Sequence, residues 1–259
     1  MSLVLVEDRD AVRHIAINRP EKRNALSRAV IEELGVALRA AAAQGSVRIV
    51  VLRGEGAMFS SGMDTADLGG LAADPTKLRE YREQILAIWN LCEDMAKPTI
   101  AQIHGACIGG AAELALACDL RVMAAEAVIG LVETRVGLIP DVGGCSRLPA
   151  LVGLGRAKEL IMASKIVDGT EAERIGLVNR VAAAADLDGA TAQLASQLLS
   201  CGPLAVGLAK GVLNAAARPG FAGTLEQELA AQELCATSED FREGMLALAE
   251  KRPPQFSGR

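Results

Sequence analysis

Two glutamates, Glu113 and Glu133, lie twenty residues apart, each beside a segment suited to hold a reactive group. Glu113 closes the run that starts at Gly105, in which a glycine-rich turn leads into a predicted helix. Glu133 opens a loop to Gly144 that is too rich in glycine and apolar residues for ordinary surface. Two carboxyl groups in one apolar pocket can have pKa values pushed apart, which leaves one acid and one base. The pair therefore indicates proton-transfer chemistry.

The turn at Gly109-Gly110 is suited to bind an anion or a carbonyl oxygen that becomes anionic. Backbone N–H groups at the start of a helix have no intrahelical partner, and the helix dipole is positive there. Glycine also lets a ligand approach the backbone closely. Glu113 follows three residues later, ~4.5 Å along the axis, and helical side chains tilt towards the N-terminus. A base beside an oxyanion site is what chemistry next to a carbonyl group requires.

A second glycine turn, Phe59 to Asp64, follows a predicted buried strand and could expose the backbone N–H of Met63. A single turn of this kind is common after strands and is more often structural. Two such turns, each after a strand and each with acids close by, make a stronger case for a site. The segment from Asn18 to Ser27 adds a cationic turn that could contact phosphates, although such a turn is also typical of a solvated loop. The chain contains no Gly-Lys-Ser/Thr phosphate loop and no dinucleotide fingerprint.

Hydrophobic periodicity predicts the elements that must position these residues. Alternation predicts a strand over Val12–Ile17, and an apolar run predicts a more buried strand over Val47–Leu52. Helical spacing predicts a helix after Ser27, its N-cap, and another from about Pro75 to Ala96. Further elements are a strand over 99–104, a helix over 110–118, a strand over 120–123, and mainly helix from about 186 to 250. This order predicts an α/β core followed by a helical C-terminal region.

Composition excludes several classes of function. The 259 residues carry a net charge of −5, with no basic stripe interleaved with aromatics, so we expect no nucleic-acid partner. No apolar run approaches eighteen residues and the N-terminus has no secretory pattern, so we expect a cytoplasmic protein without a membrane span. The six cysteines are scattered, which favours reduced core residues over disulfides or metal ligands. His14 and His104 have no ligand partners at a suitable spacing, so no metal is expected.

In this order and spacing the segments resemble the crotonase superfamily, the enoyl-CoA hydratase/isomerase family. The turn at 18–26 resembles its CoA-binding turn, and 59–64 resembles its first oxyanion element. The segment 103–119 resembles the second oxyanion element, and 137–149 resembles the loop that follows it. Matches at 172–178 and 256–259 extend the resemblance over nearly the whole chain. No single motif is decisive, but four in register are highly specific.

The resemblance implies a fold and an assembly. The expected fold class is α/β, a crotonase (ClpP-like) spiral of ββα units with a helical C-terminal trimerisation region. The implied division is a spiral catalytic core over residues 1–195 and a helical oligomerisation region over 196–259. Trimers of this family commonly stack into hexamers, so the expected partners are copies of the chain, as a homotrimer or a dimer of trimers.

The resemblance also implies the roles of individual residues. The amides of Met63 and Gly110 would form the oxyanion hole for the thioester oxygen of an acyl-CoA, and Glu113 and Glu133 match the catalytic glutamates of hydratases. No cofactor or metal is implied, because coenzyme A is part of the substrate. The residues expected along the CoA portion are Lys22, Arg23 and Ala25, with Ser61 and Asp64 near its adenine or pantetheine portions.

One departure leaves the reaction open. Asp141 follows Pro140 where many hydratases of the family have glycine. Dienoyl-CoA isomerases resemble this chain in carrying acids at all three positions, Glu113, Glu133 and Asp141. Asp141 could also cap the turn that follows it or bond to a backbone amide. The leading hypothesis is hydration of a trans-2-enoyl-CoA in acyl-CoA catabolism, the alternative is double-bond isomerisation, and a non-catalytic binding or scaffold protein is a distant third.

The segment between residues 63 and 89 usually walls the acyl pocket in this family. At helical spacing its apolar residues are also typical of plain core. The residues expected to form this wall are Met63, Leu68, Leu71, Tyr81, Ile85 and Trp89.

Overall fold

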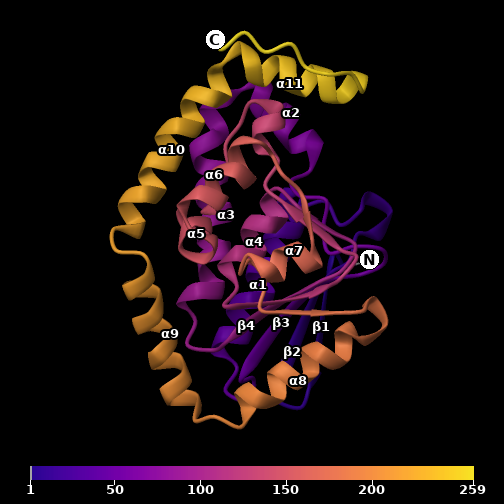
Figure 1. Ribbon diagram of the computed structural model, residues 1–259, viewed down its shortest axis with the longest axis vertical. Helices are drawn as coiled ribbons and strands as arrows, with labels where there is room; N and C mark the ends of the chain where they lie inside the picture. Colours follow the sequence, from indigo (N-terminus) through magenta and orange to yellow (C-terminus); the bar gives the residue numbers. More distant parts are fainter. Residues whose placement is uncertain (1) are drawn as a thin grey trace.

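The computed structural model describes residues 2–259, within which two β-sheets are surrounded by helices (Figure 1). The larger sheet has six strands in the order β1-β2-β3-β4-β6-β9. β1 pairs with β2 in antiparallel fashion, and all the other pairs are parallel. The strands are β1 Val4–Arg9, β2 Val12–Ile17, β3 Ile49–Gly54, β4 Thr99–Ile103, β6 Leu120–Ala124 and β9 Arg180–Ala182.

The central strands of this sheet read as continuous apolar runs because both of their faces are covered. Every residue of β4 is buried, and in β3 only Arg53 is partly exposed. Parallel strands covered on both faces show this pattern rather than alternation. The predicted strand over Val12–Ile17 is confirmed with the same bounds, while the buried strand begins at Ile49, two residues later than predicted.

The smaller sheet supplies the second strand of each turn of a spiral. Its strands are β5 Ala106–Ile108, β7 Val128–Gly130 and β8 Val167–Asp168, in the order β5-β7-β8. An isolated bridge pairs Ser60 with Cys107, which adds the segment after β3 to this sheet. Each turn thus passes through the larger sheet, then the smaller sheet, then a helix, as β4, β5 and α4 (Gly110–Ala117) do. The expected α/β spiral of ββα units is confirmed.

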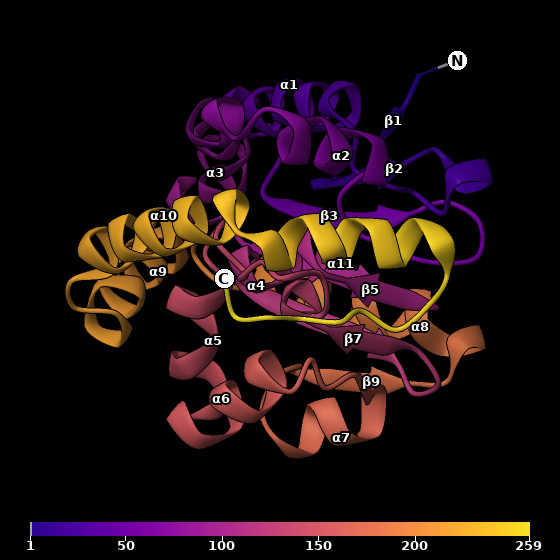
Figure 2. The ribbon, with the colours of Figure 1, turned by 90° about the horizontal axis from the view of Figure 1, so that it is seen from above.

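Eight of the helices lie between or after the strands of this spiral. In Figure 2, α1–α3 lie at one end of the molecule and α6 and α7 at the other, with strands between them. Ser27 caps α1 as predicted, because its hydroxyl accepts a hydrogen bond from the Val30 amide. Besides α4 these helices are α1 Arg28–Ala43, α2 Thr65–Ala73, α3 Leu78–Asp94, α5 Gly144–Val152, α6 Leu154–Met162, α7 Gly169–Arg174 and α8 Leu187–Leu199. Short 3-10 helices are η1 Pro20–Lys22, η2 Pro75–Lys77, η3 Glu133–Val136 and η4 Ala184–Asp186.

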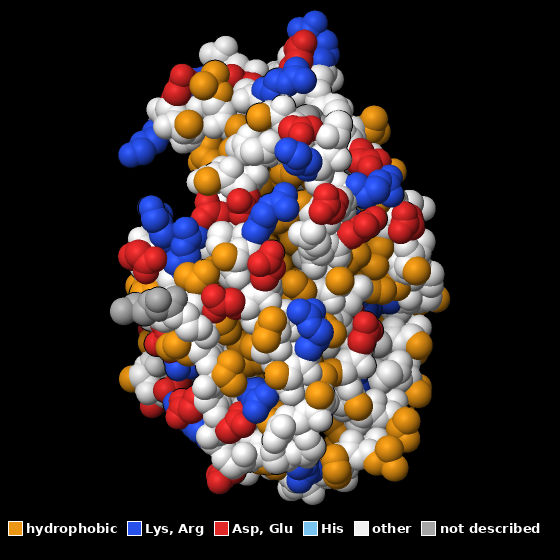
Figure 3. Space-filling model, turned by 180° about the vertical axis from the view of Figure 1, so that it is seen from behind, with side chains coloured by type: hydrophobic (Ala, Val, Ile, Leu, Met, Phe, Trp, Pro, Cys, Tyr) orange, Lys and Arg blue, Asp and Glu red, His pale blue; other side chains and the backbone are white. Residues whose placement is uncertain are grey.

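Three C-terminal helices run along the outside of the spiral and return over one end of it (Figure 1). They are α9 Pro203–Ala217, α10 Phe221–Thr237 and α11 Glu239–Glu250. Lys210 fastens α9 to the core through Asp119, at 2.8 Å, and through two backbone carbonyl groups. The outer face of α9 is apolar and exposed, and orange side chains gather along that edge in Figure 3. The exposed residues of this face are Leu204, Leu208, Val212 and Leu213.

The core between these layers is built from aliphatic residues around a few large side chains. Trp89 and Phe59 are completely buried in it. All six cysteines are free, and Cys201 is the one that is exposed, against the expectation of core positions. Within residues 2–259 no single helix is long and apolar enough to cross a bilayer. One pair of helices, bent by 104° where they join, reaches the length and apolar composition of a span when the two are taken together.

Candidate active site

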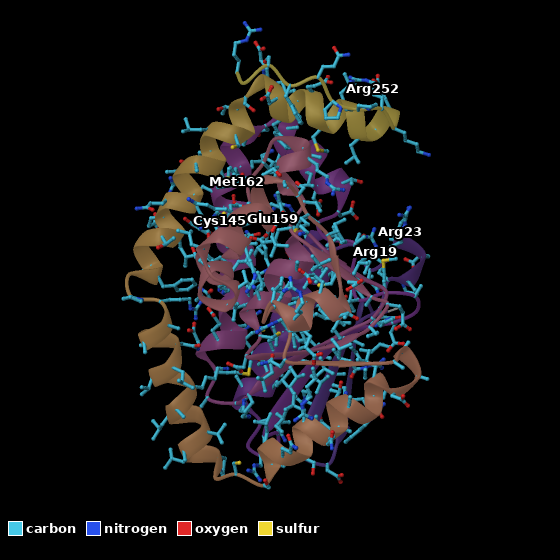
Figure 4. All side chains as sticks on the ribbon, viewed as in Figure 1. Arg19, Arg23, Cys145, Glu159, Met162 and Arg252 are labelled. Atoms are coloured by element: carbon cyan, nitrogen blue, oxygen red, sulfur yellow. The ribbon has the colours of Figure 1, made fainter. Side chains whose placement is uncertain are left out.

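One large cavity of about 990 Å³ contains the predicted site residues. It opens between the N-terminal turn and α11, where Figure 3 shows the surface hollowed with Lys and Arg side chains on both sides of the notch. In Figure 4 the labelled Arg19 and Arg23 lie on one side of this opening and Arg252 beyond it. The cavity walls include all ten residues expected from the sequence, namely Lys22, Arg23, Ala25, Ser61, Met63, Asp64, Gly110, Glu113, Glu133 and Asp141.

Two backbone N–H groups on the cavity wall are free to bind a ligand. The Leu26 amide donates to the Gly62 carbonyl and the Asp64 amide donates to the Leu26 carbonyl. In such a parallel bridge the intervening amide, that of Met63, points away from Leu26. Gly110 is the first residue of α4, so its amide has no partner inside the helix. Within residues 2–259 neither amide has an acceptor, which is what an oxyanion site requires.

Glycine brings these two amides together. A methyl group on Gly62, where φ is +94°, would lie 2.5 Å from the Ile108 carbonyl oxygen. Gly109 also has positive φ, +59°, and its amide is held by the Gly130 carbonyl at 2.9 Å. The side chain of Met63 in turn packs on Gly110, because a methyl group there would lie 2.8 Å from the Met63 sulfur. The two turns are therefore in direct backbone contact.

Glu113 is anchored through one of its carboxylate oxygens. Its Oε1 accepts hydrogen bonds from the amides of Val142 and Gly144, both at 2.9 Å. Its Oε2 lies 4.0 Å from the position that a Cβ would take on Gly110. Only 2% of the residue is exposed, in a helix whose other residues are all buried. The Glu113 side chain thus leans over Gly110 as predicted. The two hydrogen bonds from backbone amides that hold its carboxyl group were not predicted from the sequence.

Glu133 lies beside the other glycine of the same pair, Gly109. Its Oε1 would be 3.3 Å from a Cβ on Gly109, and both of its carboxyl oxygens are buried without a hydrogen-bond partner among residues 2–259. The backbone of η3, which carries Glu133, is in close contact with α11 at Val136 and Gly244. The structure therefore brings both carboxyl groups to the Gly109-Gly110 turn, with Glu113 beside Gly110 and Glu133 beside Gly109.

Asp141 lines the cavity but does not act as a helix cap. Its Oδ1 accepts a hydrogen bond from Gln232 at 3.2 Å, and its Oδ2 lies 3.5 Å from the Arg82 Nε. Helix α5 begins at Gly144 with Gly143 as its N-cap and no side-chain cap. Asp141 therefore does not cap α5, while a hydrogen bond from its own backbone amide lowers the pKa of its carboxyl group, which belongs to the cavity wall.

Burial dominates the electrostatics of these acids. It raises the pKa of Glu133 from 4.5 to about 8 and the pKa of Asp141 from 3.8 to about 7, the latter opposed by the Arg82 charge. Burial and then the charge of Glu133 raise the pKa of Glu113 well above its ordinary value, while the Gly144 amide lowers it. Buried carboxyl groups that interact this strongly titrate as a unit. At neutral pH the cluster therefore holds protons as well as negative charge. Among residues 2–259 no group of three His, Cys, Asp or Glu side chains is placed to hold a metal ion.

The N-terminal turn at the cavity mouth is shaped by Asn24. Its side chain accepts a hydrogen bond from the Arg19 amide at 2.9 Å and donates to the carbonyl groups of Glu55 and Met58, both at 2.8 Å. Asn24 is fully buried and has a left-handed backbone, with φ of +55°. The turn thus presents Lys22 and Arg23 to solvent at the mouth.

Asp64 has local partners in addition to its place on the wall. Its carboxylate caps α2 through the Ala66 amide at 2.9 Å and pairs with Arg19 at 2.5 Å. The hydrogen bond from Arg19 lowers the pKa of Asp64. Asp64 therefore fixes the start of α2 beside the cavity.

Five of the six residues expected to wall the acyl pocket do line the cavity. Trp89 is the exception: it is fully buried and belongs to the core beneath. One turn of helix separates it from Ile85 on the same face of α3, and α3 packs against α1 and α4. The wall is completed by residues from three other segments, Leu138, Ala236 and Phe241 among them.

Sequence reasoning missed three polar residues of the site: Arg82, Glu228 and Gln232. Arg82 is 3% exposed and donates to the carbonyl groups of Asp141 and Leu225, both at 2.7 Å. Glu228 and Gln232 lie on the buried face of α10. Their signal in the sequence is two polar residues within an otherwise apolar stripe at helical spacing.

Comparison with known proteins shows which family the chain resembles in sequence. The enoyl-CoA hydratase/isomerase family model matches residues 7–259. A crotonyl-CoA hydratase from Syntrophomonas wolfei subsp. wolfei is 35% identical, with 98% of this chain and 97% of the relative covered. The mitochondrial methylglutaconyl-CoA hydratase of Homo sapiens is 36% identical, over 98% of this chain and 76% of the relative.

Solved structures agree with these sequence matches. The crystal structure of an enoyl-CoA hydratase from Mycobacterium avium subsp. paratuberculosis K-10 superimposes with a TM-score of 0.88 at 29% identity, covering 98% of each chain. An enoyl-CoA hydratase/isomerase from Xanthobacter autotrophicus Py2 gives 0.88 at 32% identity, covering 99% of each chain. These matches run through both glycine turns, both glutamates and the C-terminal helices, and so the chain belongs to the enoyl-CoA hydratase/isomerase family, within the crotonase superfamily.

Proposed function

We propose that this protein is an enoyl-CoA hydratase, which adds water across the 2,3 double bond of a trans-2-enoyl-CoA to give a 3-hydroxyacyl-CoA. One observation carries the proposal: the carboxyl groups of Glu113 and Glu133 flank the Gly109-Gly110 turn in a cavity that also exposes the Met63 amide. Hydratase-named relatives over nearly the whole chain support it.

The amides of Met63 and Gly110 activate the substrate. Both donate hydrogen bonds to the thioester oxygen, which draws electron density from the conjugated double bond and makes C3 electrophilic. As water adds, the oxygen becomes an enolate oxygen, and the same two bonds strengthen. Such donors contribute about 3–4 kcal/mol each to transition-state stabilisation.

The two glutamates move the protons. A water molecule between them loses a proton to the carboxylate of the pair as its oxygen bonds to C3. The protonated partner gives its proton to C2, and the enolate collapses back to the thioester. One proton enters the pair and one leaves it, so no external acid or base is consumed. The step needs one carboxylate and one carboxylic acid, and the raised pKa values of both glutamates make it possible for the pair to keep a proton near neutral pH.

The mouth of the cavity is suited to the CoA portion of the substrate. Lys22 and Arg23 are exposed there and offer positive charge to phosphate groups. Ala25 and Ser61 line the path from the mouth to the oxyanion amides. We propose no further cofactor, and we assign the exposed apolar face of α9 to contacts between copies of the chain in a trimer.

Hydration of crotonyl-CoA, followed by the loss of its ultraviolet enoyl absorbance, tests the proposal. Glu113→Gln and Glu133→Gln should each lower kcat by about 10²–10⁴, because each removes a proton-transfer group but keeps the shape of the side chain. Glu126→Gln is the matched control, since Glu126 is an exposed acid between the two in sequence. Near-normal hydration by both site variants would show that the assignment is wrong.

Double-bond isomerisation is the second candidate, and Asp141 favours it. Its carboxyl group lies on the cavity wall with a pKa of about 7, so it can exchange a proton near neutral pH. A 3,5-dienoyl-CoA tested beside crotonyl-CoA, on wild type and Asp141→Asn, separates the two reactions. Isomerisation without hydration, abolished in Asp141→Asn, would replace hydratase by isomerase as the function.

A further inference from the structure

Glu228 accepts hydrogen bonds from the same backbone segment, residues 142–146, that donates to Glu113. It projects from α10, and its Oε2 accepts a hydrogen bond from the Gly143 amide at 2.9 Å. Its Oε1 accepts from both the amide of Ser146, at 2.6 Å, and the hydroxyl of Ser146, at 2.5 Å. Only 3% of Glu228 is exposed. All three partners are donors, which is the pattern of an ionised carboxylate.

The amides bound by Glu228 alternate with those bound by Glu113. Along the start of α5, Val142 and Gly144 donate to Glu113, whereas Gly143 and Ser146 donate to Glu228. The same stretch of backbone is therefore held between two buried carboxylates. Because these amides lie in and just before the first turn of one helix, in which the Gly143 carbonyl accepts a hydrogen bond from the Arg147 amide at 2.9 Å, displacement of one set of amides displaces the other.

We propose that Glu228 is a positioning residue for the reaction: by fixing the amides of the 142–146 segment, it holds the carboxylate of Glu113 in register with the oxyanion site. The inference rests on the proposed function, because the role of Glu113 does. It gives α10 a part in catalysis in addition to any part in assembly.

The charges around Glu228 are consistent with this role. Arg82 of α3 lies 3.8 Å from its Oε2 and offsets part of its charge. The charge of Glu228 raises the pKa of Glu113, as do those of Glu133 from η3 and Asp141 from the preceding loop. Glu228 thus affects Glu113 in two ways, through the backbone segment that both carboxyl groups bind and through its charge.

A purely structural clamp would look similar in the structure but would behave differently when mutated. A clamp that only stabilises the fold would change activity by the same factor whether or not Glu113 is present. A positioning residue acts through Glu113, so its loss should matter only while Glu113 can act. A double-mutant cycle on the full-length protein measures this difference.

The cycle uses Glu228→Gln, which keeps the size of the side chain but presents an amide N–H₂ to N–H donors. We expect Glu228→Gln to lower kcat on crotonyl-CoA by about 10–10², with KM little changed, because a misplaced catalytic group costs rate rather than binding. In the Glu113→Gln background the same substitution should have no further effect on kcat. Glu226→Gln, an exposed acid on the same helix, is the matched control and should change nothing.

Equal effects of Glu228→Gln in both backgrounds, or no effect in either, would overturn the proposal. If Glu228→Gln does not fold, Ser146→Ala replaces it in the cycle, since it removes one donor to Glu228 and none to Glu113.

A second cycle on urea unfolding needs no substrate. We expect the stability effects of Glu113→Gln and Glu228→Gln to be non-additive, and additive effects would overturn the coupling. Absence of hydratase activity in the wild type would instead refute the proposed function, and the unfolding cycle would still decide the coupling.

Discussion

Gly62→Ala is the sharpest test of how the oxyanion site is built. The substitution adds one methyl group at a position where φ is +94° and the next turn is in contact. That methyl group would lie 2.5 Å from the Ile108 carbonyl oxygen, about 0.9 Å closer than an ordinary contact of 3.4 Å. The contact is with the backbone carbonyl group of Ile108 in β5, which cannot rotate away as a side chain can. The turn that carries Met63 must therefore move relative to Gly110.

The size of the effect follows from that displacement. Holding alanine at positive φ costs about 1–2 kcal/mol of stability. A shift of nearly 1 Å takes the Met63 amide out of hydrogen-bond range of an oxygen held by Gly110. Loss of one such donor costs about 2.7–4 kcal/mol in the transition state. We therefore expect kcat to fall by about 10²–10³, and the fall should be the same for hydration and isomerisation because both form an enolate.

The assay is steady-state hydration of crotonyl-CoA, together with binding of acetoacetyl-CoA, whose enolate form would bind the same two amides. Gly69→Ala is the matched control, because nothing lies within 4 Å of the position its methyl group would take. Gly69 lies inside α2, so its replacement should leave kcat unchanged and stabilise the helix by about 0.5–1 kcal/mol.

The reasoning would be refuted if Gly62→Ala kept kcat within about threefold of wild type while the protein stayed folded, because an oxyanion donor contributes far more than that. A parallel loss of kcat in Gly69→Ala would also refute it, by showing that any added methyl group in this region impairs the enzyme.

Three further predictions concern stability and binding. The folded-state pKa of Glu133, about 8, is raised above 4.5, so its contribution to stability is present below pH 4.5 and is lost as the pH rises towards 8. In urea unfolding, the stability of Glu133→Gln relative to wild type should therefore increase as the pH rises from 4.5 to 8. A difference in stability that does not change with pH would contradict the raised pKa of Glu133. Asn24→Ala leaves three partly buried backbone groups without their side-chain partner and should cost about 2–4 kcal/mol in the same measurement. A loss under 1 kcal/mol would show that water takes the place of the Asn24 amide group. Asp64→Ala removes the cap on the Ala66 amide and should lower the free energy of unfolding by about 1 kcal/mol. It should also raise the KM for crotonyl-CoA. An unchanged KM would show that the position of α2 does not affect CoA binding.

The sequence was sufficient for the parts of the site that local geometry determines. Gly110 starts a helix after a strand, so its free amide follows from helix geometry alone. Glu113 lies one turn further on the same helix, and its lean towards Gly110 follows from the direction of helical side chains. Strand β2 was predicted with its observed bounds from the strand-like pattern of apolar and polar residues in its first half, although its last three residues are all buried.

The remaining parts depend on contacts between distant segments. The hydrogen bond between Gly143 and Glu228 spans 85 residues, and that between Arg82 and Leu225 spans 143. No periodicity encodes which carboxylate meets which amide over such separations. Trp89 was assigned to the pocket for the same reason: helical spacing identifies a buried face, but only packing decides whether that face meets a cavity or the core.

The position of α10 near the end of the chain has a consequence for the order in which the enzyme matures. A ribosome makes the chain from its N-terminus, so β9 and the whole larger sheet precede Phe221. The glycine turns and both glutamates can therefore be folded before Glu228 exists. Until α10 docks, the amides of Gly143 and Ser146 lack their acceptor. The segment that holds Glu113 thus gains its second carboxylate acceptor only after every strand of the larger sheet has been made.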